Sequence, residues 1–156
     1  MDNFVVICDS LRSLYNVGSI FRTADGAGVD KIYLCGITGR PDGPRAKRKI
    51  SKVALGAEEI VKWEYVSQAW RLTDELKRGG YKIVSLEQTK NSVRYTDFTP
   101  TFPMALIVGN EKKGVRKSLL ERSDEIIEIP MHGEKESLNV SAAFGVVACW
   151  IGGFKK

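Results

Sequence analysis

Short runs rich in valine, isoleucine and tyrosine alternate along this chain with longer stretches that favour helices. The runs, of which 61–66 is the weakest, cover residues 4–8, 31–35, 61–66, 81–86, 104–109 and 125–130. The helical stretches cover residues 16–28, 67–80, 114–124 and 137–154, with Ser67 as a candidate N-cap and Gly79-Gly80 as a stop. Near-continuous apolar strands that alternate with helices predict an α/β fold, in which a mostly parallel sheet carries helices on both faces.

The length of 156 residues and the uniform composition predict a single domain over residues 1–156. No repeat, linker or low-complexity tract divides it. The first ten residues lack the basic start of a secretion signal, and the three cysteines are widely spaced and odd in number. Reduced thiols in a cytoplasmic protein are therefore expected. The single histidine, His132, has no set of ligands at metal-binding spacing, so no metal site is predicted.

The excess of positive charge lies in one short segment. The formal net charge is +5, and the basic residues that account for it are Arg40, Arg45, Lys47, Arg48, Lys49 and Lys52. Glycine and proline are frequent in this segment, which predicts a loop rather than a helix. One interpretation is an arm that contacts phosphates, because clustered basic side chains gain affinity for nucleic acid by releasing counterions. The other interpretation is a solvated surface loop.

Familiar phosphate and nucleophile motifs are missing at the strand ends. Ligands of parallel sheets bind beyond the carboxyl ends of strands, which directs attention to the loops after residues 8, 86, 109 and 130. No GxGxxG follows a strand, and GNEKKGVR at 109–116 lacks the lysine and hydroxyl residue of a P-loop. No GxSxG elbow is present. Dinucleotide binding of the Rossmann type, P-loop chemistry and serine hydrolysis are therefore not expected.

Three of these loops carry polar residues of another kind. Asn16 and Arg22 follow the first strand, Glu111 follows a strand that ends in glycine, and Ser137 and Asn139 precede the last helix. An arginine near a strand end can hold a phosphate or a ribose, and a glycine lets a ligand approach the backbone. Each loop also has a plain structural interpretation, in which the amides and Ser137 cap helices and the charged side chains are solvated.

Together the three loops resemble the TrmH (SpoU) branch of the SPOUT methyltransferases, across essentially the whole chain. The motifs that carry the resemblance are NVGSIFRTADGAG at 16–28, LIVGNEKKG at 106–114 and IPMHGEKESLNVSAA at 129–143. The resemblance implies transfer of a methyl group from S-adenosylmethionine to a ribose 2′-hydroxyl in RNA, without metal or nicotinamide. It also implies a C-terminal trefoil knot whose loops wrap the cofactor. Many members of the family carry an added RNA-binding domain, whereas this sequence is expected to be little more than the catalytic domain.

The resemblance assigns a role to each matching residue. Arg22 matches the arginine that helps to activate the ribose hydroxyl, Asn16 matches an asparagine of the same pocket, and Glu111 matches the acid of the second motif. Ser137 and Asn139 match polar residues of the third motif. The positions expected to contact the cofactor are Leu86, Gly109, Ile129 and Leu138. The basic residues between 40 and 52 would contact the RNA, for which transfer RNA is favoured over ribosomal RNA.

Two other functions share parts of this pattern. A SPOUT enzyme that methylates a base nitrogen would have the same fold and the same cofactor. A non-catalytic RNA-binding relative would keep the basic segment without the motifs, and the presence of Asn16, Arg22 and Glu111 argues against it.

The last helix predicts a homodimer. No charged residue occurs from 138 to 154, and the large apolar residues that cover more than one helix face are Val140, Phe144, Val146, Val147, Trp150, Ile151 and Phe154. These 17 residues, interrupted by glycine and polar residues, are a poor membrane span, which needs about 20 apolar residues. A second subunit would cover one face of the helix. The alternative is a helix buried on all sides within one subunit.

Overall fold

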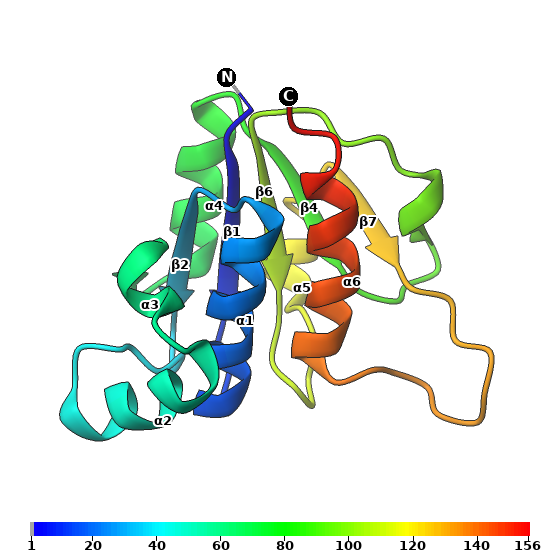
Figure 1. Ribbon diagram of the computed structural model, residues 1–156. Coiled ribbons are helices and arrows are strands. Elements are labelled where there is room, and N and C mark those ends of the chain that lie inside the picture. The colour runs from blue at the N-terminus through cyan, green and yellow to red at the C-terminus, as the bar shows by residue number, and fades with distance from the viewer. Residues whose placement is uncertain (1) are drawn as a thin grey trace.

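The computed structural model describes residues 2–156, which form one parallel sheet with helices on both faces (Figure 1). The strand order is β3-β2-β1-β6-β4-β7-β5, and every neighbouring pair is parallel. The strands are β1 (Phe4–Asp9), β2 (Lys31–Cys35), β3 (Lys62–Val66), β4 (Lys82–Leu86), β5 (Val93–Arg94), β6 (Met104–Val108) and β7 (Glu125–Glu128). The predicted α/β fold is confirmed.

The helices form two layers, one on each face of the sheet. They are α1 (Leu14–Ala27), α2 (Pro44–Ala54), α3 (Ala57–Ile60), α4 (Ala69–Arg78), η1 (Tyr95–Asp97), α5 (Lys117–Leu120) and α6 (Val140–Gly152). On β1, Phe4, Val6 and Cys8 belong to a core that includes α1 and α6. Val5 and Ile7, on the opposite face of the same strand, belong to a second core with α4 and α5. The central strands are therefore buried on both faces, as their apolar sequences predict.

Helices α1 and α6 lie side by side and run in the same direction (Figure 1). A hydrogen bond joins Asn16 to Asn139 at their first turns. At their last turns Gly152 packs so closely on Ala27 that a β-carbon would collide with the Ala27 carbonyl. These two contacts place the start of α6, and the loop before it, at the carboxyl edge of the sheet.

The prediction of a loop over the basic segment is wrong, because most of that segment forms α2. Gly43 is the N-cap and Pro44 occupies the first turn, where a missing N–H removes no helical hydrogen bond and a fixed φ suits the helix. Ile50 and Ala54 are buried in the core shared with α1. Gly18 of α1 allows this close packing, since a β-carbon there would lie 2.6 Å from the Ile50 carbonyl oxygen. Glycine and proline begin a helix here rather than prevent one.

The other predicted element boundaries differ less from those of the structure. The N-cap position of α4 is Gln68 rather than Ser67, whereas Gly79 and Gly80 end that helix as predicted. Within the stretch 114–124 only the short α5 is helical, because Gly114 has a left-handed φ of 70° and closes a turn. The short elements α3, η1 and β5 were not anticipated, since none exceeds four residues and so none shows a periodic pattern.

A long exposed segment, residues 129–139, joins β7 to α6 and appears in orange at the right of Figure 1. Residues 132–139 are all exposed. The last strand ends at Glu128, two residues before Pro130. The trefoil knot that the resemblance implies for this region stays a prediction.

Candidate functional site

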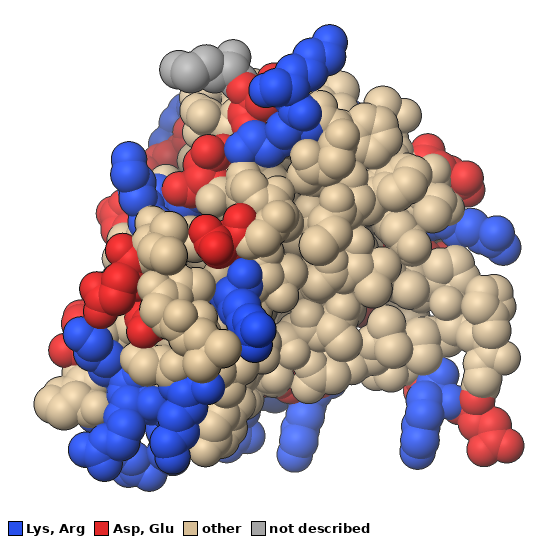
Figure 2. Space-filling model, viewed as in Figure 1, with Lys and Arg blue, Asp and Glu red and all other residues tan. Residues whose placement is uncertain are grey.

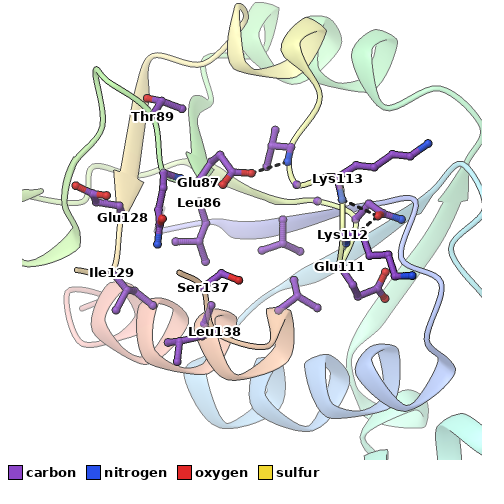
Figure 3. Close-up of a pocket in the computed structure, with 18 of the residues that line it drawn as sticks. Leu86, Glu87, Thr89, Glu111, Lys112, Lys113, Glu128, Ile129, Ser137 and Leu138 are labelled. Atoms are coloured by element: carbon purple, nitrogen blue, oxygen red, sulfur yellow. Dashed lines mark hydrogen bonds between the residues drawn. The ribbon is translucent and has the colours of Figure 1, made fainter. Parts of the chain in front are cut away.

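A cavity of about 400 Å³ opens at the carboxyl ends of β4, β6 and β7 (Figure 3). The loops that follow these three strands line it, together with the start of α6. The positions expected to contact a cofactor, Leu86, Gly109, Ile129 and Leu138, all lie in its lining. The structure therefore brings three loops that are far apart in the sequence into one site; two of them, after β6 and β7, are among the three polar loops named from the sequence, whereas the loop after β1 does not line the cavity.

The loop between β6 and α5 is held rigidly by Asn110. Its Oδ1 accepts hydrogen bonds from the backbone N–H groups of Lys112 and Lys113 at 2.9 and 3.0 Å, and its Nδ2 donates to the Ser10 carbonyl at 2.9 Å. Gly109 has no room for a side chain, because a β-carbon would lie within 2.5 Å of the Val115 nitrogen. This fixed backbone forms one wall of the cavity.

Glu87, the residue after β4, fixes the other end of this loop and was missed by the sequence analysis. Its Oε2 accepts a hydrogen bond from Val115 N at 2.8 Å, and its Oε1 accepts one from Gln88 N at 2.9 Å. The same carboxylate packs against Gly114, where a β-carbon would collide with it. The signal available was the position of an acid directly after a buried strand, but nothing in the sequence identifies its partners.

Glu111 connects the second motif to the first. Its Oε1 accepts hydrogen bonds from Ser13 N and Arg12 N, each at 3.0 Å, and from Asn16 Nδ2 at 3.4 Å. Burial acts to raise the pKa of Glu111, but these N–H donors outweigh it and lower the pKa below its usual value. The acid is thus an anionic cap on the start of α1, where the helix dipole also favours negative charge.

Asn16 and Asn139 extend this connection to the third motif. Asn139 is the N-cap of α6, and its Oδ1 accepts hydrogen bonds from Ser141 N at 2.9 Å and Ala142 N at 3.3 Å. Its Nδ2 donates to Asn16 Oδ1 at 3.2 Å. Asn16 itself is not a cap, because Ser13 occupies that position of α1. Glu111, Asn16 and Asn139 therefore form one chain of hydrogen bonds that joins the three motifs.

The two other predicted catalytic residues lie differently. Ser137 is exposed and lines the cavity beside Leu138 (Figure 3). Arg22 is an exposed residue of α1 that does not line the cavity. Its neighbour Thr23 contacts α6 at Gly145, 3.8 Å from a β-carbon position there. Within one subunit, then, the arginine stands outside the site, on the surface beside α6.

The basic residues between 40 and 52 gather at one lower corner of the molecule, over α2 (Figure 2). Two of the six are paired: Lys47 Nζ lies 3.1 Å from Glu59, and Arg40 lies 2.8 Å from Asp42. Arg40 also stacks on the ring of Tyr65, 4.8 Å from its centroid. No ion pair within residues 2–156 involves the other four, which are Arg45, Arg48, Lys49 and Lys52.

Residues 2–156 offer neither a cluster of metal ligands nor a helix suited to a membrane. Across residues 2–156, no group of three or more histidine, cysteine, aspartate or glutamate side chains could hold a metal ion. Over the same residues, no helix has both the length and the apolar character that crossing a membrane requires.

Comparison with known proteins gives consistent matches. The model of the SpoU rRNA Methylase family matches residues 3–149. The chain is 34% identical over 146 residues to a tRNA (guanosine(18)-2′-O)-methyltransferase of Aquifex aeolicus, which is 93% of this chain and 66% of that protein. Another curated relative is covered over 54% of its length, so this chain spans between about half and two thirds of the relatives it matches.

Two solved structures have the same fold. A TrmH/SpoU tRNA modifying enzyme of A. aeolicus superposes with a TM-score of 0.86 at 30% identity, over 97% of this chain and 75% of that one. The SpoU methyltransferase AviRb of Streptomyces viridochromogenes, in complex with the cofactor AdoMet, superposes with a TM-score of 0.83 at 25% identity, over 97% and 60% of the two chains.

Proposed function

We propose a function from one premise: the chain belongs to the SpoU rRNA methylase family. The protein transfers a methyl group from S-adenosylmethionine to a ribose 2′-hydroxyl of RNA. The observation that carries this proposal is the cavity at the ends of β4, β6 and β7, where the loops of the second and third motifs meet. The AdoMet complex of AviRb supports the cofactor, and the name of the Aquifex relative supports the reaction.

The residues of the cavity fit S-adenosylmethionine. Its volume of about 400 Å³ lies in the range of small-molecule sites. Leu86, Ile129 and Leu138 offer apolar surface to an adenine ring, and the backbone at Gly109 lies in the same lining. Glu87 and Glu128 supply negative charge, which suits a positively charged ligand. When bound, this cofactor supplies a methyl group on a sulfonium sulfur.

The polar residues of the site divide into residues that position loops and a residue that can contact the substrate. Glu111, Asn16 and Asn139 are positioning residues, because their polar atoms are engaged with one another and with helix starts. Ser137 is available to contact the ribose, since it lies exposed at the rim. Methyl transfer needs an oxygen held in line with the reacting methyl carbon, so fixed loops account for much of the rate.

Arg22 would reach the site from a second subunit. The exposed face of α6 includes Val146, which is 41% exposed; Phe154, just beyond the helix end, is 40% exposed, and Leu138 at 42% extends this surface to the rim of the cavity. Figure 2 shows a broad uncharged surface over this helix. A homodimer through this face would cover the apolar side chains and bring Arg22 of each subunit toward the cavity of the other. There it would stabilise the 2′-oxygen as its proton leaves.

The finer parts of the proposal follow from the same premise. Transfer RNA is the favoured substrate, as the name of the Aquifex relative supports. The segment 129–139 threads to form the trefoil knot, and the chain acts as a catalytic domain. The RNA substrate and the free cysteines Cys8, Cys35 and Cys149 favour the cytoplasm.

Calorimetry tests the cofactor directly. The purified protein should release heat with S-adenosylmethionine and with its demethylated product, but not with NAD, at micromolar to millimolar ligand. The variant Ile129→Asp, which places a charge in the apolar lining, should bind neither. Folded parent protein that binds neither sulfur compound would rule out the proposed function.

A further inference from the structure

Three basic residues stand at the mouth of the cavity, apart from the basic helix. These are Arg12, Lys112 and Lys113, here called the mouth cluster; all three are exposed, and both lysines line the cavity. None of the ion pairs formed within residues 2–156 involves any of them. The cluster thus presents three positive charges that no carboxylate in the described chain neutralises.

The backbone beneath the mouth cluster is rigid. Asn110 holds the N–H groups of Lys112 and Lys113, and the Glu111 carboxylate holds Arg12 N at 3.0 Å. The adjacent acid is therefore turned toward the start of α1 while its neighbours project outward (Figure 3). Because these hydrogen bonds use backbone and not basic side chains, the backbone of the three residues is fixed while their charged side chains remain free to bind a ligand.

The mouth cluster continues toward the basic helix. Arg12 lies two residues before Leu14, whose side chain packs against Gly39 so closely that a β-carbon would collide with it. From that contact the chain leads through Arg40 to α2, whose unpaired basic residues lie beyond. Tyr15, 51% exposed in the first turn of α1, offers an aromatic face beside this path.

The opposite side of the cavity carries negative charge. Glu128 lies across the cavity from Lys112 and Lys113 (Figure 3). The adjoining hollow is lined by Glu128, Glu134 and Glu136, with Lys135 as the single cation. A polyanion that reaches this cavity would be repelled on that side and attracted on the side of α1.

We propose that the mouth cluster binds the RNA phosphates that flank the methylated ribose, and that the strand continues along the path to α2, with Tyr15 available to stack on a base. This inference rests on the proposed function and names the part of the surface that positions the target nucleotide. The two basic surfaces have different roles. Helix α2 contributes affinity for RNA, whereas the mouth cluster also fixes which nucleotide lies beside the cavity. Loss of register lowers turnover even when RNA saturates the enzyme.

The test replaces the three charges and compares two matched variants. Arg12→Gln/Lys112→Gln/Lys113→Gln removes the mouth cluster and keeps its backbone hydrogen bonds. Lys62→Gln/Arg71→Gln/Arg78→Gln removes three exposed cations from β3 and α4, away from the cavity. Arg12→Lys/Lys112→Arg/Lys113→Arg keeps the charge of the cluster. Binding of unfractionated transfer RNA is measured over a range of salt, and methyl transfer is measured at saturating RNA.

For the mouth variant we expect the slope of log affinity against log salt to fall by about 2 to 3, at roughly 0.7 to 0.9 per lost phosphate contact. We also expect kcat at saturating RNA to fall roughly 10- to 100-fold. The α4 control and the charge-keeping variant should match the parent slope. An unchanged slope in the mouth variant overturns the contact, and a reduced slope with parental kcat overturns its placement beside the target ribose. A parent that binds S-adenosylmethionine but methylates no RNA would instead refute the proposed function.

Discussion

Glu111 begins a chain of hydrogen bonds that joins three sequence motifs. It accepts hydrogen bonds from the start of α1 and from Asn16, which in turn is bonded to the N-cap of α6. A carboxylate whose pKa is lowered in this way is a poor proton acceptor. The acid of the second motif therefore acts by holding loops in place, and proton removal from the ribose must depend on other groups.

Replacing Glu111 by glutamine should destabilise the protein in a pH-dependent way. Because its pKa is lowered by folding, its contribution is complete above the pKa of about 4.3 of an unfolded glutamate and is lost as pH falls through the lower folded value. We expect Glu111→Gln to lower the free energy of unfolding by about 1 to 3 kcal/mol near neutral pH. The difference from the parent should shrink below about pH 4.

Urea unfolding at several pH values measures this difference. The control is Glu75→Gln, which removes an exposed acid from α4 and should change the free energy of unfolding little. A difference between parent and Glu111→Gln that stays constant from neutral pH to about pH 3 would contradict the assigned hydrogen bonds.

Arg22 should matter for turnover more than for cofactor affinity. It lies outside the cavity of its own subunit, so Arg22→Ala should leave the calorimetric affinity for S-adenosylmethionine within about twofold of the parent. Loss of a charge that acts only in the transition state should lower kcat by roughly 100-fold or more. Arg78→Ala, on the exposed side of α4, is the matched control. Parental kcat in Arg22→Ala would make Arg22 a surface residue without a catalytic role.

At the scale of elements, the sequence predicts those strands and helices that show a clear apolar pattern. The central strands were placed almost to the residue, because burial on both faces gives β1 and β6 uninterrupted apolar runs. The basic helix is not evident from the sequence because glycine and proline are frequent in loops, whereas Gly43 is the N-cap here and a proline in the first turn begins the helix. The partners of Glu87 and Glu111 could not be foreseen, since they depend on loops brought together only by the strand order.

The helical form of the basic segment changes what its charges can do. A stripe formed by Arg45, Arg48, Lys49 and Lys52 recurs at helical spacing, whereas Lys47 is paired with Glu59. Replacing the stripe by glutamine, which preserves helix propensity, should reduce the salt slope of transfer RNA binding by up to about 3. The same measurement on Lys47→Gln should show a much smaller change. Equal slopes in the parent and the stripe variant would mean that α2 is a solvated surface that does not contact RNA.

At the scale of the whole molecule, α6 separates the inside of the subunit from a surface that needs a partner. Phe144, Val147 and Ile151 are buried against the sheet, but Val146 and Phe154 are exposed. A helix buried on all sides within one subunit, the alternative considered from the sequence, is therefore wrong. The exposed part of the apolar helix is what a second copy would cover.

A charge on this face should prevent dimerisation. We expect the parent to sediment at about twice the 17.3 kDa of one chain and Val146→Asp to sediment as a monomer. Ile60→Asp is the matched control, because Ile60 is 68% exposed on α3, away from α6. A parent that is monomeric at micromolar concentration and still methylates RNA would exclude the proposed dimer.

Mixed dimers test whether the second subunit completes the site. Arg22→Ala retains its cavity, and Ile129→Asp retains its arginine, so each variant alone should be inactive. When the two are mixed and allowed to exchange subunits, half of the sites in a mixed dimer are complete. Methylation should return to roughly a quarter of the parent value if pairing is random. A mixture as inactive as its components would show that Arg22 acts in the site of its own subunit.

The central claim is that this chain methylates a ribose 2′-hydroxyl of RNA, and nucleoside mass analysis tests it most directly. Transfer RNA from cells with and without the gene is digested to nucleosides, and the purified protein with S-adenosylmethionine is then added to the RNA that lacks the modification. The account predicts one nucleoside that loses a methyl group from its ribose fragment when the gene is absent and regains it with the parent protein, but not with Arg22→Ala. A methyl group found on the base, or no methylated nucleoside in transfer or ribosomal RNA that depends on the gene, would contradict it.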